Sequence, residues 1–555
     1  MKKLYLALAF LASAALFSNP AVAQPTIAAN GVRNSGSYAF PGIPNAGIAE
    51  GSIFVIFGQN LGPAKIVQVS SFPLPTTQGL AGTTVQVSVN GANVFAIMLY
   101  TLATQVAAVL PSNTPIGTGT VTVTYNGQTS APAPITVVKS TFGIFAVNQS
   151  GSGPGVLQNV ISATDRPFNS PTESAQPGQV MILWGTGLGP VASGSEQDGP
   201  LPGDMPNLNV QVFVGGVEAK IQYRGRSGCC VGDDQIVFVV PPGVEGCSLP
   251  VYVQIDNVLS NFVTMSVGSG GSACQDPSSL TAAQLAAAQK NGALKLGVLA
   301  VGRFITESIS ASGTTMQRND NMSATFESEP LADLGAGAPT PLGTCTVIQF
   351  PSGAPYPPAP TGLDAGTVTA ATPVGSYPVP PIMGQVGDYL LSFFPAEPTS
   401  TPGIINNGIL LTPGTETFTF TGGSVVAAGS GSIAFPLTFA WTNDSSVTSI
   451  DRSQPLTITW SGGTSGAVVN MFIQSQVSVG VGAELSCAAD ATLGTFTIPQ
   501  VFLSALPPSY TDSGGNPQGS FSIVEQWIGS FTNASLDLAQ TQFSDTVDKG
   551  PMPVH

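Results

Sequence analysis

Histidine, the side chain most often used for acid–base and metal chemistry, occurs once in this chain, as the last residue, His555. A Ser-His-Asp triad, a Cys-His pair and a histidine zinc site all need an imidazole held by a folded scaffold. A terminal residue is usually disordered. We therefore expect no catalytic residues, no cofactor and no metal site, and we expect that the protein is not an enzyme.

Carboxylates could still do chemistry, because two acids suffice for glycoside hydrolysis. No acid stands in a motif that fixes a partner at a known separation, so surface positions are the expected role. The segments "RNDNMS" (318–323) and "GDD" (232–234) offer oxygen ligands, but neither is a complete calcium loop, and calcium binding stays open. The acids considered are Glu173, Glu196, Asp198, Asp233, Asp234, Glu327 and Glu329.

The cysteines favour disulfides, because their number is even and their spacing lacks the paired C-x-x-C of a zinc site. Neighbouring cysteines have poor geometry for a bond with each other. We therefore expect Cys229 and Cys230 to pair separately with the next two cysteines. The last two cysteines are expected to form a bond across the C-terminal region that stabilises the fold by about 4–5 kcal/mol. The six candidates are Cys229, Cys230, Cys247, Cys274, Cys345 and Cys487.

A glycine-rich phrase, "PGQVMILWGTGLGP" (177–190), superficially matches a phosphate-binding loop. Such a loop needs a helix after its third glycine, because the helix N-terminus holds the phosphate. Here a proline-rich stretch without helical periodicity follows. Gly185, Gly187 and Gly189 are instead expected to supply positive φ at a bulged strand exit.

The same phrase stands 127 residues earlier as "EGSIFVIFGQNLGP" (50–63). "PLP" follows each copy, and then an alternating run, "VQVSVNG" or "VQVFVGG", that is typical of a half-buried strand. "TQVAAVLP" and "DQIVFVVP" also match, after the insertion "YRGRSGCCVGDD" in the second copy. Two copies of one all-β unit explain these matches, and the strand spacing favours sandwiches.

These residues resemble a known family. "GSIFVIFGQNLGP" and "GQVMILWGTGLGP" are similar to the opening strand of IPT/TIG-type immunoglobulin-like domains. Residues 26–267 resemble the tandem modules of uncharacterised exported acidobacterial proteins. The resemblance rests on the motifs "PLPT", "GTGLGP" and "GCC…DQIVFVVP…GC", and a segment at 441–463 also resembles a segment of these proteins. The resemblance implies tandem immunoglobulin-like sandwiches and an exported setting. It brings no established activity.

Composition agrees with a folded exported protein. Charged residues are 8% and hydrophobic residues 43% of the chain, against about 25% charged residues in typical soluble proteins. A charged start, an apolar run and "AVA" before Gln24 predict a cleaved signal peptide at 1–23, the alternative being an uncleaved anchor. The chain has 15 basic and 30 acidic residues, so we expect no nucleic-acid partner. No second apolar stretch is long enough to span a membrane.

The fold class is therefore expected to be all-β, with tandem immunoglobulin-like sandwiches, a C-terminal β-rich region and one short linker helix near 281–290. The C-terminal boundary is the least defined. The expected divisions are a signal peptide (1–23), module 1 (24–139), module 2 (140–268), a linker with the helix (269–292), a β-rich domain (293–429) and a C-terminal sandwich (430–555).

The leading functional hypothesis is a non-catalytic protein, secreted or at the cell surface or periplasm, used for surface interaction, adhesion or matrix structure. The alternatives are a carbohydrate-binding or carbohydrate-active protein and a structural spacer. The expected partner is an extracellular polysaccharide or an envelope protein, through sandwich-end loops or exposed aromatics. The residues proposed for that surface are Tyr223, Arg224, Arg226 and Trp527. Ligand identity and oligomeric state stay open.

Overall fold

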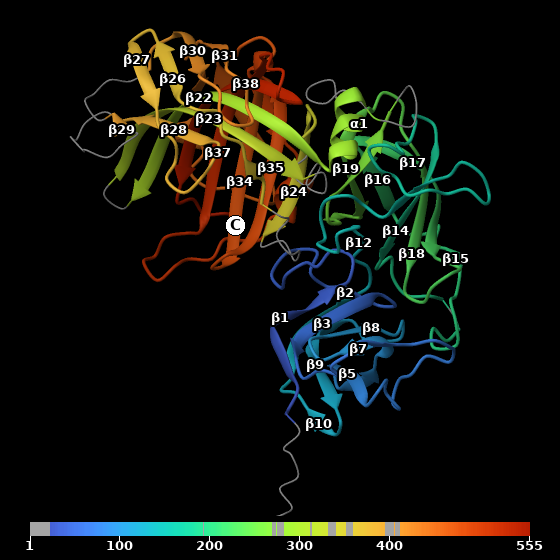
Figure 1. Cartoon of the computed structure of the whole chain (residues 1–555). Coiled ribbons are helices and arrows are strands. Elements are labelled where there is room, and N and C mark those ends of the chain that lie inside the picture. Colours follow the sequence, from blue (N-terminus) through green and yellow to red (C-terminus); the bar gives the residue numbers. More distant parts are fainter. Residues whose placement is uncertain are drawn as a thin grey trace, which may run out of the picture.

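The structure is a computed structural model of the full chain. It describes residues 23–192, 194–268, 274, 282–310, 313–330, 340–350, 359–394, 404–405 and 411–555. Residues 1–22 of the predicted signal peptide and most of the predicted linker before the helix lie outside these residues. We call residues 24–139 repeat 1, residues 140–268 repeat 2 and residues 293–555 the C-terminal unit. Figure 1 shows the three as separate β bodies in contact.

Repeat 1 is a sandwich of two sheets. Its strands are β1 (Thr26–Asn34), β2 (Ile48–Ala49), β3 (Ile53–Gln59), β4 (Val67–Gln68), β5 (Thr83–Val89), β6 (Ala92–Phe95), β7 (Ile97–Leu102), β8 (Gln105–Val109), β9 (Gly117–Tyr125), β10 (Gln128–Thr129) and β11 (Ala133–Val138). One sheet has the order β1-β3-β8-β7-β4 and the other β2-β11-β9-β5-β6. Alternate side chains of a strand share a face, so Val85 and Val87 of β5 pack inward against Phe54 of β3.

Repeat 2 copies this plan. Its strands are β12 (Gly143–Ile144), β13 (Leu157–Asn159), β14 (Val180–Thr186), β15 (Gly203–Asp204), β16 (Val210–Val214), β17 (Val217–Arg226), β18 (Asp234–Val239), β19 (Gly246–Ile255), β20 (Val258–Leu259) and β21 (Val263–Val267). β14 pairs antiparallel with β18 as β3 pairs with β8. The two glycine phrases therefore occupy corresponding strands, which confirms the repeat.

The C-terminal unit is built on one large sheet with the order β24-β35-β34-β37-β38-β22-β23-β28-β29. Two smaller sheets, β27-β26-β30-β31 and β32-β33-β36, complete the unit. The strands are β22 (Ala293–Ser310), β23 (Gly313–Pro330), β24 (Thr344–Phe350), β25 (Thr361–Gly362), β26 (Val368–Thr372), β27 (Gly375–Val379), β28 (Asp388–Phe393), β29 (Ile404–Ile405), β30 (Gly414–Phe420), β31 (Gly429–Phe435), β32 (Ala440–Trp441), β33 (Leu456–Ser461), β34 (Val468–Ser478), β35 (Val481–Asp490), β36 (Thr495–Ile498), β37 (Gly519–Ser530) and β38 (Leu538–Gly550).

The large sheet contains strands from both sides of the predicted division at 429/430. β22 lies parallel to β38 over thirteen paired residues, from Leu296 opposite Leu538 to Ser308 opposite Gly550. The first strand of one predicted domain thus pairs with the last strand of the other. Hydrogen bonding between strands so far apart in sequence leaves no local signal, and the two segments share one sheet instead of forming two.

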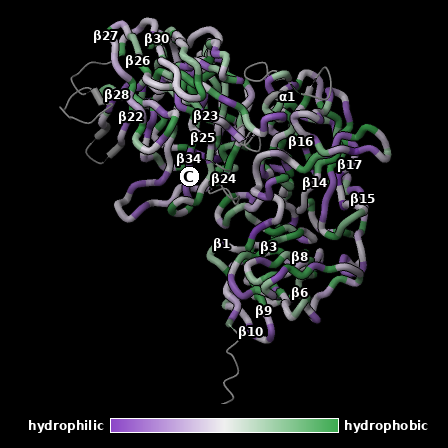
Figure 2. Tube along the Cα trace, viewed as in Figure 1, coloured by the Kyte–Doolittle hydropathy of each residue, from purple (hydrophilic) through white to green (hydrophobic). Residues whose placement is uncertain are grey.

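The predicted linker helix is present as α1 (Ala282–Asn291), and a second short helix, α2 (Gln500–Ala505), was not predicted. Among the described residues, no helix has the length and apolar character needed to cross a membrane. Figure 2 shows hydrophobic and hydrophilic residues interleaved along the strands of all three bodies. This is the pattern of sheets with one face turned to a core, and the predicted all-β class with tandem immunoglobulin-like sandwiches is confirmed.

Candidate functional site at the junction of the two repeats

The glycine phrase of repeat 2 forms a cradle for a buried carboxylate. β14 ends at Thr186, and the next two backbone N–H groups, of Gly187 and Leu188, both donate to Asp234 Oδ2, at 2.7 and 2.8 Å. Gly187 has φ 111° and Gly189 has φ 131°, a region that favours glycine. The expected positive φ is thus found at these two glycines. Gly185 is not among the positive-φ residues, and a side chain there would meet the Phe142 ring.

Arg226 completes this buried site. Its Nη1 lies 2.6 Å from Asp234 Oδ1, and its Nη2 donates to the carbonyl oxygen of Gly189 at 2.7 Å. The two side chains are 4% and 0% exposed. Burial raises the pKa of Asp234, while Arg226 and the two backbone N–H groups oppose that rise. A buried charge without a partner is destabilising, so the burial of Asp234 requires Arg226 and the burial of Arg226 requires Asp234.

A second carboxylate extends the site into repeat 1. Glu196 lies 3.8 Å from Arg226 Nη2 and accepts hydrogen bonds from the backbone N–H and the hydroxyl of Ser112, at 2.9 and 2.8 Å. Thr186 Oγ1 also accepts from the N–H of Ile53, at 2.9 Å, and donates to the carbonyl of Gly232. Ser112 and Ile53 belong to repeat 1. The polar network therefore crosses the junction of the repeats.

The insertion peculiar to repeat 2 lies on the same junction. Val231 is buried in a small apolar cluster with Leu74, Ile97 and Val109 of repeat 1. Gly232, with φ 82°, passes so close to repeat 1 that an added Cβ would lie 2.6 Å from Ile53 Cγ1. Residues 227–233 of the insertion therefore connect the two repeats, and we call them the junction loop.

The junction loop carries a disulfide that corrects one prediction. Cys229 and Cys230 are bonded to each other, and Cys247 is bonded to Cys274. The predicted separate pairing of the neighbours is therefore wrong. That prediction rested on the general rule that neighbouring cysteines have poor geometry for a bond, and the junction loop is an exception to this rule. While bonded, the two sulfurs are not thiolate ligands, although Asp233 lies with them in a compact group.

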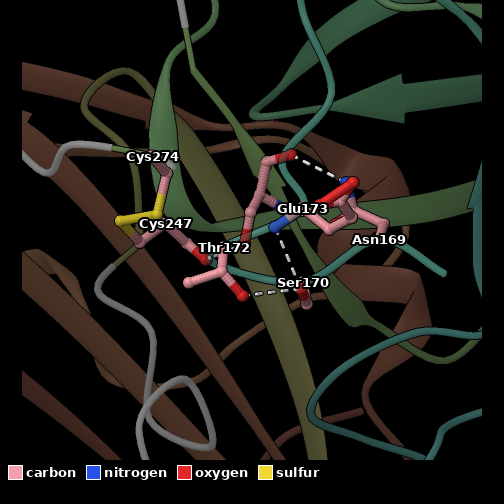
Figure 3. The surroundings of a disulfide bond; sticks show 7 residues. Asn169, Ser170, Thr172, Glu173, Cys247 and Cys274 are labelled. Carbon is pink, nitrogen blue, oxygen red and sulfur yellow. Dashed lines mark hydrogen bonds between the residues drawn. A yellow bond between two sulfur atoms is a disulfide. The ribbon is translucent and has the colours of Figure 1, made fainter. Parts of the chain in front are cut away.

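The remaining two disulfides anchor other parts of the chain. In Figure 3, the Cys247–Cys274 bond lies beside the turn at 169–173, where the N–H of Glu173 donates to Ser170 Oγ at 3.1 Å. The N–H of Cys274 also donates to the carbonyl of Pro171. Cys345 on β24 is bonded to Cys487 on β35, opposite it in register, as predicted.

The structure separates the four residues proposed for a binding surface. Tyr223 and Arg226 lie together on β17, where the Tyr223 hydroxyl donates to the Arg226 carbonyl at 2.6 Å. Arg226 is buried and is therefore not available to a partner. Arg224 turns away and donates to the carbonyls of Met205 and Pro206. Trp527 lies on β37 of the C-terminal unit, stacked on Phe543. These residues do not form one surface.

A groove of about 580 Å³ adjoins the site. Its walls come from the turn after β14 and from the proline-rich segment around β15, and Lys139 and the largely buried Arg226 are also among its lining residues. The lining is mainly aliphatic and includes Leu188, Pro190, Val191, Leu201, Pro202 and Met205. No aromatic side chain is among the described lining residues, so the groove offers apolar contacts and few stacking surfaces for sugars.

The C-terminal unit holds a further buried set of charges that the sequence reasoning missed. Arg303 on β22 pairs with Asp545 on β38, with Nε 2.6 Å from Oδ1, and Glu525 stands opposite Asp545 on β37. Burial raises the pKa of Asp545 to about 6, with Arg303 opposing. Asp320, in the segment 318–323 that offered oxygen ligands, is fully buried and paired with Arg318. Alternation along β22 could have revealed Arg303 as an inward residue.

Comparison with known proteins adds little. No family model matches the chain, and no curated protein is similar to it. Domains 4–9 of the surface layer protein SbsC are 10% identical over 94% of this chain and 82% of that one, with a TM-score of 0.17. Immunoglobulin domains 1–4 of Sidekick-1 are 11% identical over 94% and 100%, with a TM-score of 0.11. A Bacteroides ovatus mixed-linkage glucan utilization protein, SGBP-B, is 10% identical over 86% and 98%, with a TM-score of 0.12. Such low scores carry no functional argument.

Proposed function

We propose that the protein is an exported, non-catalytic scaffold that works through surface interaction outside the membrane. The observation that carries this proposal is the junction of the repeats, where Val231 and the Arg226–Asp234–Glu196 network bind one sandwich to the next. Burying charged groups between two modules costs desolvation free energy. Modules joined by a flexible linker would have no buried charges between them. The proposed role is to hold its modules in a fixed arrangement.

Contacts of the C-terminal unit support the same role. Phe502 of α2 packs against Tyr252 and Phe262 of repeat 2, with ring centroids 5.8 and 6.5 Å apart. Gln349 of β24 donates to Asn45 of repeat 1. A small cavity of about 40 Å³ is lined by residues of all three bodies. Each body therefore touches the other two. One disulfide lies within repeat 2, one joins repeat 2 to Cys274 of the linker, and one lies within the C-terminal unit.

The chemistry of the site supports binding more than turnover. Glu196 and Asp234 approach one arginine, but both are buried and hydrogen-bonded, so neither is offered to a substrate as an acid or base. The aliphatic groove beside them favours an apolar segment of an envelope protein over a polysaccharide as the partner. Release of reducing ends from a polysaccharide by the purified protein, lost on one carboxylate-to-amide substitution, would overturn the proposal.

The rigid arrangement can be tested by small-angle X-ray scattering on residues 24–555. Val231→Asp removes about 1.5–3 kcal/mol of apolar burial and places a charge in the junction. We expect a larger radius of gyration than in the wild type. Val217→Asp is the matched control, because Val217 is 43% exposed and should leave scattering unchanged. A wild-type profile that requires many inter-repeat orientations would contradict the proposal.

A further inference from the structure

A lysine amine and a carboxyl group face each other inside the C-terminal unit. Lys549 on β38 and Glu307 on β22 are opposite residues of two parallel strands. Lys549 Nζ lies 3.4 Å from Glu307 Oε2, and each residue is 5% exposed. Long charged side chains are rarely buried to this degree. The pair is thus held at short range with little access for solvent.

A backbone carbonyl, an indole ring and a second acid surround this pair. Lys549 Nζ donates to the backbone carbonyl of Asp444 at 2.6 Å and lies 5.5 Å from the centre of the Trp441 ring. The Asp444 carboxyl is close enough to act on the pKa of Glu307. Burial raises the pKa of Glu307, and the Asp444 charge and hydrogen bond add to this rise, while Lys549 opposes it. The Glu307 carboxyl is therefore easier to protonate than an exposed glutamate.

We propose that Lys549 and Glu307 condense to form an amide cross-link inside the folded protein. A proton passes from the Lys549 ammonium to the Glu307 carboxylate, which gives a neutral amine and a carboxylic acid. The amine nitrogen attacks Glu307 Cδ and forms a C–N bond. Asp444 takes a proton from that nitrogen and delivers it to the departing hydroxyl, the C–O bond breaks, and one water molecule leaves. No oxidant, reductant or cofactor is consumed.

The other buried ion pairs described above show why this pair differs. Arg226, Arg303 and Arg318 also contact buried carboxylates. A guanidinium stays protonated in proteins, so it does not attack a carboxyl carbon, whereas a lysine amine loses its charge readily when buried. The amine, the acid and a second acid in contact with the first are brought together at Lys549.

The cross-link would lie in the interior of the large sheet, between two neighbouring strands. It would join the last strand, β38, to the first, β22, along the sheet that also carries Cys345–Cys487 on β24 and β35. The final residues of the chain would then be covalently held even if the hydrogen bonds of β38 opened. This inference does not depend on the proposed scaffold function.

Mass spectrometry of the denatured, reduced protein tests the proposal. We expect residues 24–555 to weigh one water molecule less than their sequence mass, and a digest to contain a branched peptide joining residues 307 and 549. Lys549→Arg keeps the charge and should restore the full mass. Asp444→Asn should fold and accumulate uncross-linked protein, because the proton relay is lost. Val547→Ala, a change at a buried residue two positions earlier on β38, is the control for general disturbance of the sheet; its mass should still lack one water.

Two results would overturn the inference. One is a folded wild-type protein, with its disulfides formed, that keeps its full mass after long incubation. The other is a branched peptide that joins Lys549 to Asp444, because that result would move the acyl group from Glu307 to its neighbour. Neither result depends on whether a variant folds, since both are measured on the wild-type chain.

Discussion

The turns that end β3 and β14 have nearly the same sequence and different bonding. Leu61 and Leu188 are both fully buried at corresponding positions. The N–H of Leu61 donates to the backbone carbonyl of Ala103 at 2.9 Å, whereas the N–H of Leu188 donates to the Asp234 carboxylate at 2.8 Å. Buried backbone donors need acceptors. The acceptor is a backbone carbonyl in repeat 1 and a side-chain carboxylate in repeat 2.

The difference follows from the length of one connection. In repeat 1, β7 ends at Leu102 and β8 begins at Gln105, so the short link brings its own carbonyls to the turn. In repeat 2 the junction loop fills this place, and Asp234 at its end supplies the acceptor. A buried carboxylate needs a cation, and Arg226 at the other end of the loop provides it. The insertion thus introduced a charged site and a contact with repeat 1 together.

The largest expected effect comes from removing the carboxylate. Asp234→Ala leaves two N–H groups and Arg226 without their main acceptor, and we expect repeat 2 to lose about 3–5 kcal/mol of unfolding free energy. Thr104 is the corresponding residue of repeat 1 and is exposed, so Thr104→Ala should change stability by less than about 0.5 kcal/mol. Native-state hydrogen exchange, followed in peptides of β14 and β3, measures both.

A double variant sharpens this result. If the charges matter mainly as a pair, Arg226→Met combined with Asp234→Leu should be less destabilised than Asp234→Ala alone, because no unpaired charge remains. Equal losses in Asp234→Ala and Thr104→Ala would refute the contrast between the two turns.

Much of this comparison could be predicted from sequence, but the charged site could not. The alternation of Val85, Val87 and Val89 and the repeated phrase identify the strands and their pairing, because both depend on short-range pattern. Gly187 and Gly189 have the predicted backbone. The contact between Arg226 and Asp234, and their approach to Ser112 of repeat 1, depend on how the loop closes and how two bodies dock. No local pattern encodes these distances.

The C-terminal unit shows the same limit. Its individual strands follow from alternation, and the Cys345–Cys487 bond was predicted by elimination among the cysteines. The parallel pairing of β22 with β38 joins residues on either side of the predicted boundary. The buried charges of Arg303 and Asp545 therefore appear only when these distant strands are placed together.

A smaller, pH-dependent effect is expected in the junction loop. Burial, and then the nearby Asp234 charge, raise the pKa of Asp233 to about 7, with Arg226 opposing. Since an unfolded aspartate has a pKa of about 3.9, the folded loop favours the protonated acid. Its contribution to stability should be complete below about pH 4 and be lost as the pH rises towards 7.

Hydrogen exchange of the junction loop across this range, corrected for intrinsic rates, tests the pH effect. Asp233→Asn should flatten the profile, because the amide does not titrate. The link at 103–104 of repeat 1 contains no acid and should show no such trend. Identical profiles for the wild type and Asp233→Asn would assign the effect to another group.

The smallest effect is expected from the disulfide that repeat 1 lacks. Cys229 and Cys230 are adjacent, so their bond closes almost no chain and removes little entropy from the unfolded state, in contrast to Cys345–Cys487, whose sequence separation is 142. The loop is also held independently by Val231 and by the hydrogen bond from the N–H of Ser227 to the Asp233 carbonyl. We expect Cys229→Ser with Cys230→Ser to cost less than about 0.5 kcal/mol, and Cys345→Ser with Cys487→Ser about 4–5 kcal/mol, by denaturant unfolding. If the first pair cost as much as the second, the bond itself would shape the loop, and the contact between the repeats would depend on redox conditions.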